Sequence, residues 1–251
     1  MSTTSTSGGP LTGRVALVTG ASGGIGQALA RRLAAEGAAL ALSYGAHAEP
    51  VQALVAEITG AGGTATAFSA DLRDPDAPGA LARAAADQAG PVDILVSNAG
   101  LGRRQPLEEI TAGDFDEMLA VNLRSPFLLA QAVIPGMREQ RFGRILFVSS
   151  GAAFTGGIVG PHYAASKSGL HGLTHFLAAR TARDGVTVNA IAPALITGTD
   201  MLPGDPEELR ERVPVGRLGQ PDEVADLAAG ILRNPYLTSQ VVSLDGGMHP
   251  R

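Results

Sequence analysis

The chain has 251 residues, of which 45% are hydrophobic, and a formal net charge of -5. It contains no cysteine, which excludes disulfides, thiolate metal sites and a cysteine nucleophile. Neither a Lys/Arg cluster nor an apolar run of about 20 residues is present, so we expect no nucleic-acid partner, no membrane segment and a cytoplasmic location. The length suits one core, and we expect a disordered tail at residues 1–10 and a single domain over 11–251.

Short apolar runs alternate with segments of helical spacing along the whole chain. Strands are predicted at 15–19, 38–43, 64–68, 92–97, 145–149, 187–192 and 240–244. Helices are predicted at 25–36, 51–58, 76–88, 111–140, 162–183 and 221–232. Because the strands are nearly continuous Val, Ile, Leu and Ala, they indicate a parallel sheet covered on both faces. The sequence therefore predicts a single doubly wound α/β domain of Rossmann type, with a seven-stranded parallel sheet and helices on both faces.

A glycine-rich turn separates the first strand from the first helix and reads Thr19-Gly20-Ala21-Ser22-Gly23-Gly24-Ile25-Gly26. At this place in a βα unit, the free N–H groups and the positive dipole end of the helix can hold a pyrophosphate. A tight turn with close helix packing would use the same glycines, but the position after the first strand favours nucleotide binding. The expected contacts are Gly20, Ser22, Gly24, Ile25 and Gly26.

Four motifs, in order along the chain, resemble the short-chain dehydrogenase/reductase family. They are the turn at 19–26, Asn98-Ala99-Gly100, Ser150 and Tyr163-Ala-Ala-Ser-Lys167, and the resemblance covers about residues 13–248. The segments 163–177, 213–219 and 244–248 look most like 3-oxoacyl-acyl-carrier-protein reductases. The resemblance implies an oxidoreductase that moves a hydride between a nicotinamide cofactor and a carbonyl or secondary alcohol.

The candidate catalytic residues are Asn122, Ser150, Tyr163 and Lys167. Tyr163 and Lys167 are four residues apart on a predicted helix, so both side chains share one face, and a nearby ammonium would lower the pKa of the tyrosine. Ser150 follows a strand at the edge where parallel sheets bind ligands, and its hydroxyl can hold the substrate oxygen. The resemblance adds Asn122 as the holder of a proton-relaying water. Pro126 lacks the N–H that would bond the Asn122 carbonyl.

Further cofactor contacts are implied by the resemblance. In chain order they are Ser43, Asp71, Leu72, Asn98, Ala99, Gly100, Tyr163, Lys167, Pro193, Ile196 and Thr197. Asp71 would meet the adenine, or it would cap the following helix, and both roles stay open. Thr199 is an alternative to Thr197 beside the nicotinamide carboxamide.

The end of the second strand decides between NADP(H) and NAD(H), because an acid there binds the ribose diol and repels a 2'-phosphate. Here the strand ends Ser43-Tyr44-Gly45, and the first carboxylate is Glu49. This favours NADP(H), with NAD(H) possible. Gly23 stands where many NADP-using relatives carry an arginine, so His47 is the cation expected nearby.

The sequence is consistent with three functions. The first is NADPH-dependent reduction of a 3-oxoacyl thioester, the second is oxidation of a sugar, steroid or other small secondary alcohol, and the third is a non-catalytic dinucleotide-binding regulator. A regulator has no use for the four catalytic residues, which disfavours the third function. Relatives that reduce carrier-bound substrates present basic residues beside the site, and Arg141 and Arg183 fall in suitable places for an acyl carrier protein, whereas Asp184 and the acidic net charge oppose that reading. The resemblance and the long apolar helices at 115–140 and 169–183 suggest a homotetramer. His171 and His175 have the spacing of the histidines in a zinc motif, but Gly172 replaces the glutamate that the motif needs. No metal is therefore expected.

Overall fold

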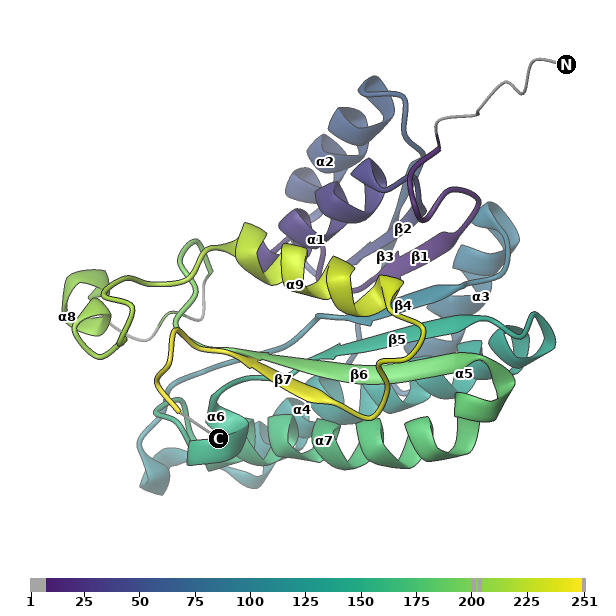
Figure 1. Cartoon of the computed structure of the whole chain (residues 1–251). Coiled ribbons are helices and arrows are strands. Elements are labelled where there is room, and N and C mark those ends of the chain that lie inside the picture. Colours follow the sequence, from purple (N-terminus) through teal and green to yellow (C-terminus); the bar gives the residue numbers. More distant parts are fainter. Residues whose placement is uncertain (1–7, 200–201, 203–204, 250–251) are drawn as a thin grey trace, which may run out of the picture.

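The computed structural model describes residues 8–199, 202 and 205–249, which form seven parallel strands in one sheet with helices on both faces (Figure 1). The strand order is β3-β2-β1-β4-β5-β6-β7. The bounds are β1 Val15–Val18, β2 Ala39–Tyr44, β3 Ala65–Ser69, β4 Ile94–Ser97, β5 Gly143–Val148, β6 Val186–Pro193 and β7 Val241–Leu244. The predicted doubly wound fold is confirmed.

Two layers of helices enclose this sheet (Figure 1). One layer holds α1 Gly24–Ala35, α2 Ala48–Gly60 and α9 Pro221–Arg233. The other holds α3 Ala77–Ala89, α4 Ala112–Leu119, α5 Ser125–Glu139 and α7 Pro161–Thr181. Shorter helices are η1 Leu107–Glu109, α6 Ala152–Thr155, η3 Ala182–Asp184 and α8 Pro206–Arg210. The sequence periodicity predicted none of η1, α6 and α8, and it placed the start of η3 within the helix at 162–183.

Alternate side chains of each central strand enter the two cores. On β1, Val18 packs against the layer of α1, α2 and α9, whereas Leu17 packs against the layer of α3, α5 and α7. All four residues of β1 are buried. Because both of its faces are covered, β1 is apolar at every position and shows no alternation of polar and apolar residues.

The chain passes from β1 to β2 and β3 on one side and then returns to place β4 on the other side of β1. The sheet therefore has its topological switch point between β1 and β4. In such sheets, the crevice at the carboxyl ends of these two strands is where ligands bind.

The segment predicted as one helix at 111–140 is two helices joined by a turn of π-helix, Ala120–Arg124. In this wider turn the N–H of Ser125 donates to the carbonyl of Ala120, five residues back. Pro126 follows, and its missing N–H removes the ordinary helical bond to Asn122. The stretch Ala112–Glu139 is long and apolar enough to span a membrane, but more than half of it is buried against this domain, as in a core helix.

Residues 1–7 of the predicted tail lie outside the described residues. From Gly9 onward the chain is attached to the domain, because Thr12 N–H donates to the Gly9 carbonyl and Leu11 N–H donates to the Glu36 carbonyl at 2.8 Å. Leu11 is 4% exposed and joins the core.

Candidate active site

The glycine-rich turn is hydrogen-bonded to the end of β4. Thr19 Oγ1 accepts from the N–H groups of Asn98 and Ala99, each at 3.1 Å. The Asn98 side-chain amide donates to the carbonyls of Thr19 and Gly20, at 3.1 and 3.0 Å. Gly20 has φ +66°, and a Cβ there would lie 2.7 Å from Ala99 Cα. The two motifs therefore form one rigid rim at the switch point.

Helix α1 begins at this rim with no side-chain cap. The helix passes so close to the turn that a Cβ on Gly26 would overlap the Gly20 carbonyl, and one on Gly24 would overlap the Gly198 carbonyl. The N–H groups of its first turn have no intrahelical partners and point into the crevice where a phosphate can accept them. The glycines thus create both the close approach and the open N-terminus.

A cavity of about 510 Å³ extends from this turn across the ends of β2 and β3. Its lining includes the predicted residues Gly20, Ser22, Gly24, Ile25, Gly26, Ser43, Asp71, Leu72, Asn98, Ala99 and Gly100. Ser43 is only 2% exposed, and its carbonyl accepts from Ala21 N–H at 2.9 Å. Gly45, two residues later, is exposed and has open space where a side chain would begin.

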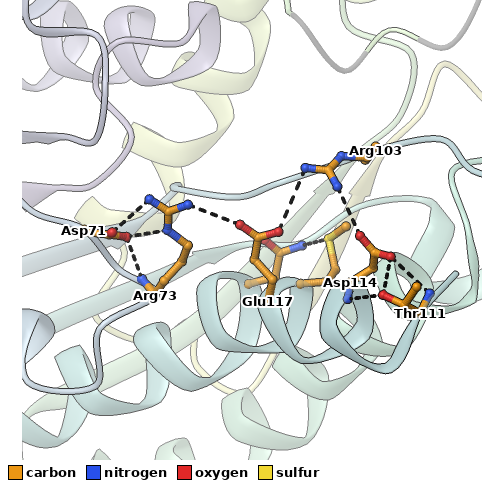
Figure 2. Close-up of polar contacts among 8 residues, drawn as sticks. Asp71, Arg73, Arg103, Thr111, Asp114 and Glu117 are labelled. Carbon is orange, nitrogen blue, oxygen red and sulfur yellow. Dashed lines mark hydrogen bonds and ion pairs between the residues drawn. The ribbon is translucent and has the colours of Figure 1, made fainter.

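Asp71 is the first member of a chain of alternating charges along the rim of this cavity (Figure 2). Both of its carboxylate oxygens are bound by Arg73, at 2.8 and 2.9 Å, and this pairing lowers the pKa of Asp71. Arg73 also contacts Glu117, and Arg103 joins Glu117 to Asp114, which caps α4 through Thr111. Asp71 is thus held by Arg73 and does not cap α3, whose N-cap is Asp76.

A second cavity, of about 330 Å³, lies at the carboxyl ends of β5 and β6. Ser150, Tyr163 and Lys167 all line it, so the structure brings these three predicted residues together. Burial raises the pKa of Tyr163, and a hydrogen bond with Ser150 acts in the opposite direction. The direction differs from the sequence expectation, because the Lys167 ammonium is 5.9 Å from the centre of the tyrosine ring and burial outweighs its influence.

Lys167 is 2% exposed, and its Nζ donates to the Val148 carbonyl at 2.8 Å. Burial lowers its pKa to about 8. Asn122 is fully buried nearby, where its side chain bonds both main-chain groups of Leu101, at 2.7 and 2.9 Å. A Cβ on Gly100 would lie 3.2 Å from Lys167 Nζ and 3.3 Å from Asn122 Oδ1, so glycine gives these two side chains their common space.

The adjacent serines at the end of β5 both line the cavity, but their hydroxyls have different partners. Ser149 is 4% exposed, and its hydroxyl bonds the Lys167 carbonyl at 3.1 Å and His171 Nε2 at 2.9 Å. Ser150 instead hydrogen-bonds Tyr163. His171 therefore takes part in packing around the helix α7 backbone. His162 is fully buried and lines neither cavity.

The loop after β6 contributes Pro193 and Ile196 to the catalytic cavity. Thr197 turns away, because its hydroxyl donates to Gln220 Oε1 at 2.8 Å and its N–H donates to the Gly219 carbonyl at 2.9 Å. Thr199, the alternative to Thr197, lines both cavities. Leu195, earlier in the same loop, has a left-handed φ of +51°, which no sequence pattern signalled.

Some lining residues were not predicted from the sequence. They are contributed by α6, the segment after α8 and the C-terminal end, and include Thr155, Ile158, Leu209, Arg212, Met248 and His249. Apart from Met248, which ends the segment 244–248, no motif marks them, because their approach to the cavity depends on how these short segments fold over it.

Residues 14–209 match the family model described as short chain dehydrogenase, which is more than half of the chain. The chain belongs to the short-chain dehydrogenase family. It is 38% identical over 242 residues to a 3-oxoacyl-[acyl-carrier-protein] reductase of Synechocystis, covering 95% of this chain and 98% of the relative. It is therefore an oxidoreductase.

Two other relatives of this short-chain dehydrogenase broaden the comparison. A (2S)-[(R)-hydroxy(phenyl)methyl]succinyl-CoA dehydrogenase subunit BbsD of Thauera aromatica is 37% identical over 239 residues, covering 93% of this chain and 96% of the relative. The crystal structure of a blue fluorescent protein from a metagenomic library, in complex with NADPH, has a TM-score of 0.90 and 37% identity. It covers 96% of this chain and all of that one.

Proposed function

We propose that this short-chain dehydrogenase is an NADPH-dependent reductase that converts a carbonyl, in the favoured case a 3-oxoacyl thioester, to a secondary alcohol. One observation carries the proposal. Ile25, Asn98 and Thr199 line both cavities, so the glycine-rich cleft is continuous with the cavity that holds Tyr163. A dinucleotide laid across this boundary has its reactive end beside the tyrosine.

The residues of the cleft fit a dinucleotide. The uncapped start of α1 suits the pyrophosphate, and the glycines leave the space that a Cβ would fill. At the end of β2 no carboxylate opposes a 2'-phosphate, and His47 lines the same cavity. The metagenomic neighbour contains NADPH, which supports the choice of NADP(H), with NAD(H) as the alternative.

When bound, NADPH supplies the hydride for the carbonyl carbon. Ser150 donates a hydrogen bond to the carbonyl oxygen and positions it beside the Tyr163 hydroxyl. Tyr163 then donates its proton to that oxygen as general acid. Because burial raises its pKa, the tyrosine stays protonated until the reaction and is suited to donation.

Lys167 is placed to stabilise the tyrosinate that remains. Its charge lies 5.9 Å from the tyrosine ring centre, and its pKa of about 8 lets it pass a proton on near neutral pH. Asn122 fixes Leu101 at the adjoining wall, and the carbonyl that Pro126 leaves unbonded can hold the relaying water. The four residues thus form a path for the proton that Tyr163 must regain.

The substrate class is supported by the relatives and by the cavity lining. The Synechocystis relative is a 3-oxoacyl-[acyl-carrier-protein] reductase. The lining is largely apolar, with Val148, Ile158, Leu202, Leu209 and Met248. Such a wall suits an acyl chain and opposes an aldose, whose hydroxyls would lose hydrogen bonds there. The second candidate is a dehydrogenase of another secondary alcohol, which the Thauera coenzyme A relative supports.

The test is cofactor oxidation against a substrate panel. NADPH and NADH consumption is followed with acetoacetyl thioesters, simple ketones and aldoses. Turnover of the thioesters with NADPH supports the proposal. Exclusive turnover of aldoses, or strict dependence on NADH, contradicts it.

We also propose that the enzyme is a cytoplasmic homotetramer. Phe115 of α4, Phe127 of α5 and Phe176 of α7 are 38%, 39% and 59% exposed, which is unusual for such large apolar side chains in a monomer. Arg141 and Arg183 lie together, since Arg141 donates to the Arg183 carbonyl at 2.8 Å. They precede β5 and β6, so this proposed docking point for an acyl carrier protein lies at the edge of the sheet opposite the subunit's own catalytic cavity. Multi-angle light scattering tests the assembly, and a stable monomer at micromolar concentration contradicts it.

A further inference from the structure

The catalytic cavity differs in charge from the rest of the protein. The chain carries 24 Asp and Glu against 19 Lys and Arg. Among the described residues that line this cavity there is no carboxylate, whereas Lys167, Arg212 and His249 all line it. Lys167 is buried beside the tyrosine, so Arg212 supplies a positive charge at a separate part of the wall.

Arg212 is anchored by its backbone but its guanidinium has no partner among the described residues. Its N–H donates to the Leu209 carbonyl at 3.1 Å, and the next residue, Val213, is 5% exposed in a small core with Leu209 and Leu218. Nearby arginines differ, because Arg210 pairs with Glu207 and Arg217 pairs with Glu223. The backbone of Arg212 is thus fixed at the cavity, and its guanidinium is available to bind a ligand.

The wall near Arg212 also has a second polar group. His249 lines the cavity, and its backbone N–H donates to Asp245 at 3.2 Å, whereas its ring Nδ1 is buried without a hydrogen-bond partner among the described residues. Asp245 itself does not line the cavity. Much of the remaining lining is apolar, with Leu202, Leu209 and Met248 among its members. A ligand that matches this lining therefore combines a reactive carbonyl, an apolar part and an anionic group.

We propose that Arg212 is a specificity-determining residue that binds an anionic group of the substrate, with His249 as a second donor. The proposal rests on the carbonyl reductase function and narrows its substrate to an acidic one. The anionic group is a carboxylate, as in an oxo acid, or a phosphate, as in a coenzyme A or carrier-bound thioester. Both accept charge-assisted hydrogen bonds from a guanidinium.

The test compares Arg212→Gln with Arg210→Gln, a matched loss of charge two residues away at a side chain that does not line the cavity. Three substrates are used with NADPH: 5-oxohexanoate, its neutral methyl ester, and acetoacetyl-coenzyme A. We expect Arg212→Gln to raise KM about tenfold for an anionic substrate and less than twofold for the ester, with kcat little changed. Arg210→Gln should leave all three KM values within twofold.

The outcomes separate the two sources of charge. A rise for 5-oxohexanoate alone assigns a carboxylate, and a rise for the coenzyme A thioester alone assigns a phosphate. Equal effects on the ester and the anionic substrates, or none on any of them, overturn the proposal while leaving the reductase function intact.

A binding titration distinguishes a failure of the anion-site proposal from a failure of the reductase function. Calorimetry measures the affinity of 5-hydroxyhexanoate and of its methyl ester for wild type and Arg212→Gln, without any turnover. If wild type reduces no carbonyl at all, the reductase function fails. Preferential binding of the acid that is lost in Arg212→Gln still supports the anion site, and equal binding of acid and ester overturns it.

Discussion

Lys167 Nζ and the Val148 carbonyl oxygen form a buried hydrogen bond of 2.8 Å that ties helix α7 to the end of strand β5. The lysine is 2% exposed, yet it must carry a charge for part of its working cycle. It is also the single lysine of the sequence. Its titration can therefore be followed without interference from any other lysine.

We expect the Lys167 pKa to be visible in the stability of the enzyme. The folded pKa of about 8 lies below the ordinary 10.5, so between these values the unfolded state binds more protons and stability rises with pH. Burying the charged lysine lowers the free energy of unfolding by on the order of 3 kcal/mol. This loss of stability is fully present below pH 8 and disappears above pH 10.5. Urea unfolding should show wild type gaining stability relative to Lys167→Met across this window. A difference that does not change with pH contradicts the assignment.

Tyr163→Phe should remove nearly all turnover while leaving cofactor affinity within a few-fold. The ring still packs in place, but no proton can be donated to the substrate oxygen. Tyr236→Phe is the matched control, because Tyr236 is 96% exposed and lines neither cavity. Steady-state kinetics and cofactor fluorescence measure the two quantities. Retention of more than a tenth of wild-type kcat would exclude Tyr163 as the acid.

Gly26→Ala should weaken both the fold and cofactor binding. The new methyl would overlap the Gly20 carbonyl, which forces α1 away from the turn and costs about 2 to 4 kcal/mol of unfolding free energy. Cofactor affinity should fall at least tenfold. Gly23→Ala is the control, because its Cβ would meet nothing nearer than 3.8 Å, and we expect a loss within about 1 kcal/mol. Similar losses in both variants would mean that the close approach at Gly26 is unimportant.

Gly45→Asp should turn the enzyme from NADPH towards NADH. A side chain at this exposed position has open space and places a carboxylate at the end of β2, where it repels a 2'-phosphate. Like charges in close contact should lower kcat/KM for NADPH about ten- to a hundredfold. Gly45→Asn supplies the same shape without the charge and should keep the NADPH preference.

Gly45 is a better position than Ser43 for testing cofactor choice. The sequence suggested Ser43 as the strand end, but Ser43 is 2% exposed, so an aspartate there would be buried and would destabilise the fold. If wild type already prefers NADH, the choice of NADP(H) is wrong. If Gly45→Asp keeps its NADPH preference, the end of β2 does not contact the ribose.

The regular elements could be predicted because each has a local cause. Continuous apolar strands such as Val15–Val18 follow from burial on two faces, and the end of α1 follows from its loss of apolar periodicity at Gly37. Ser150, Tyr163 and Lys167 were found because strand ends and helical spacing place them. They meet in one cavity because the order of the strands brings their elements together. The alternation of strands and helices along the chain indicates that order.

Other parts of the site depend on contacts that local patterns do not contain. Arg73 pairs with Asp71 and also with Glu117, which lies 44 residues further along the sequence. Thr199 lines the catalytic cavity and Thr197 does not, because Thr197 bonds Gln220, a residue 23 positions further along the sequence. The expected lowering of the Tyr163 pKa failed because spacing gives a shared helix face but not the 5.9 Å separation or the depth of burial.

Because of the π-turn at Ala120–Arg124, the function of this segment depends on its exact number of residues. A single extra residue in a helical turn rotates everything before it by about 100° relative to everything after it. Deleting one residue here would restore a regular helix and swing Asn122 off Leu101, or swing the core residues Leu129 and Val133 off the sheet. Substitutions on this helix should therefore be tolerated far better than insertions or deletions, even at positions that contact nothing.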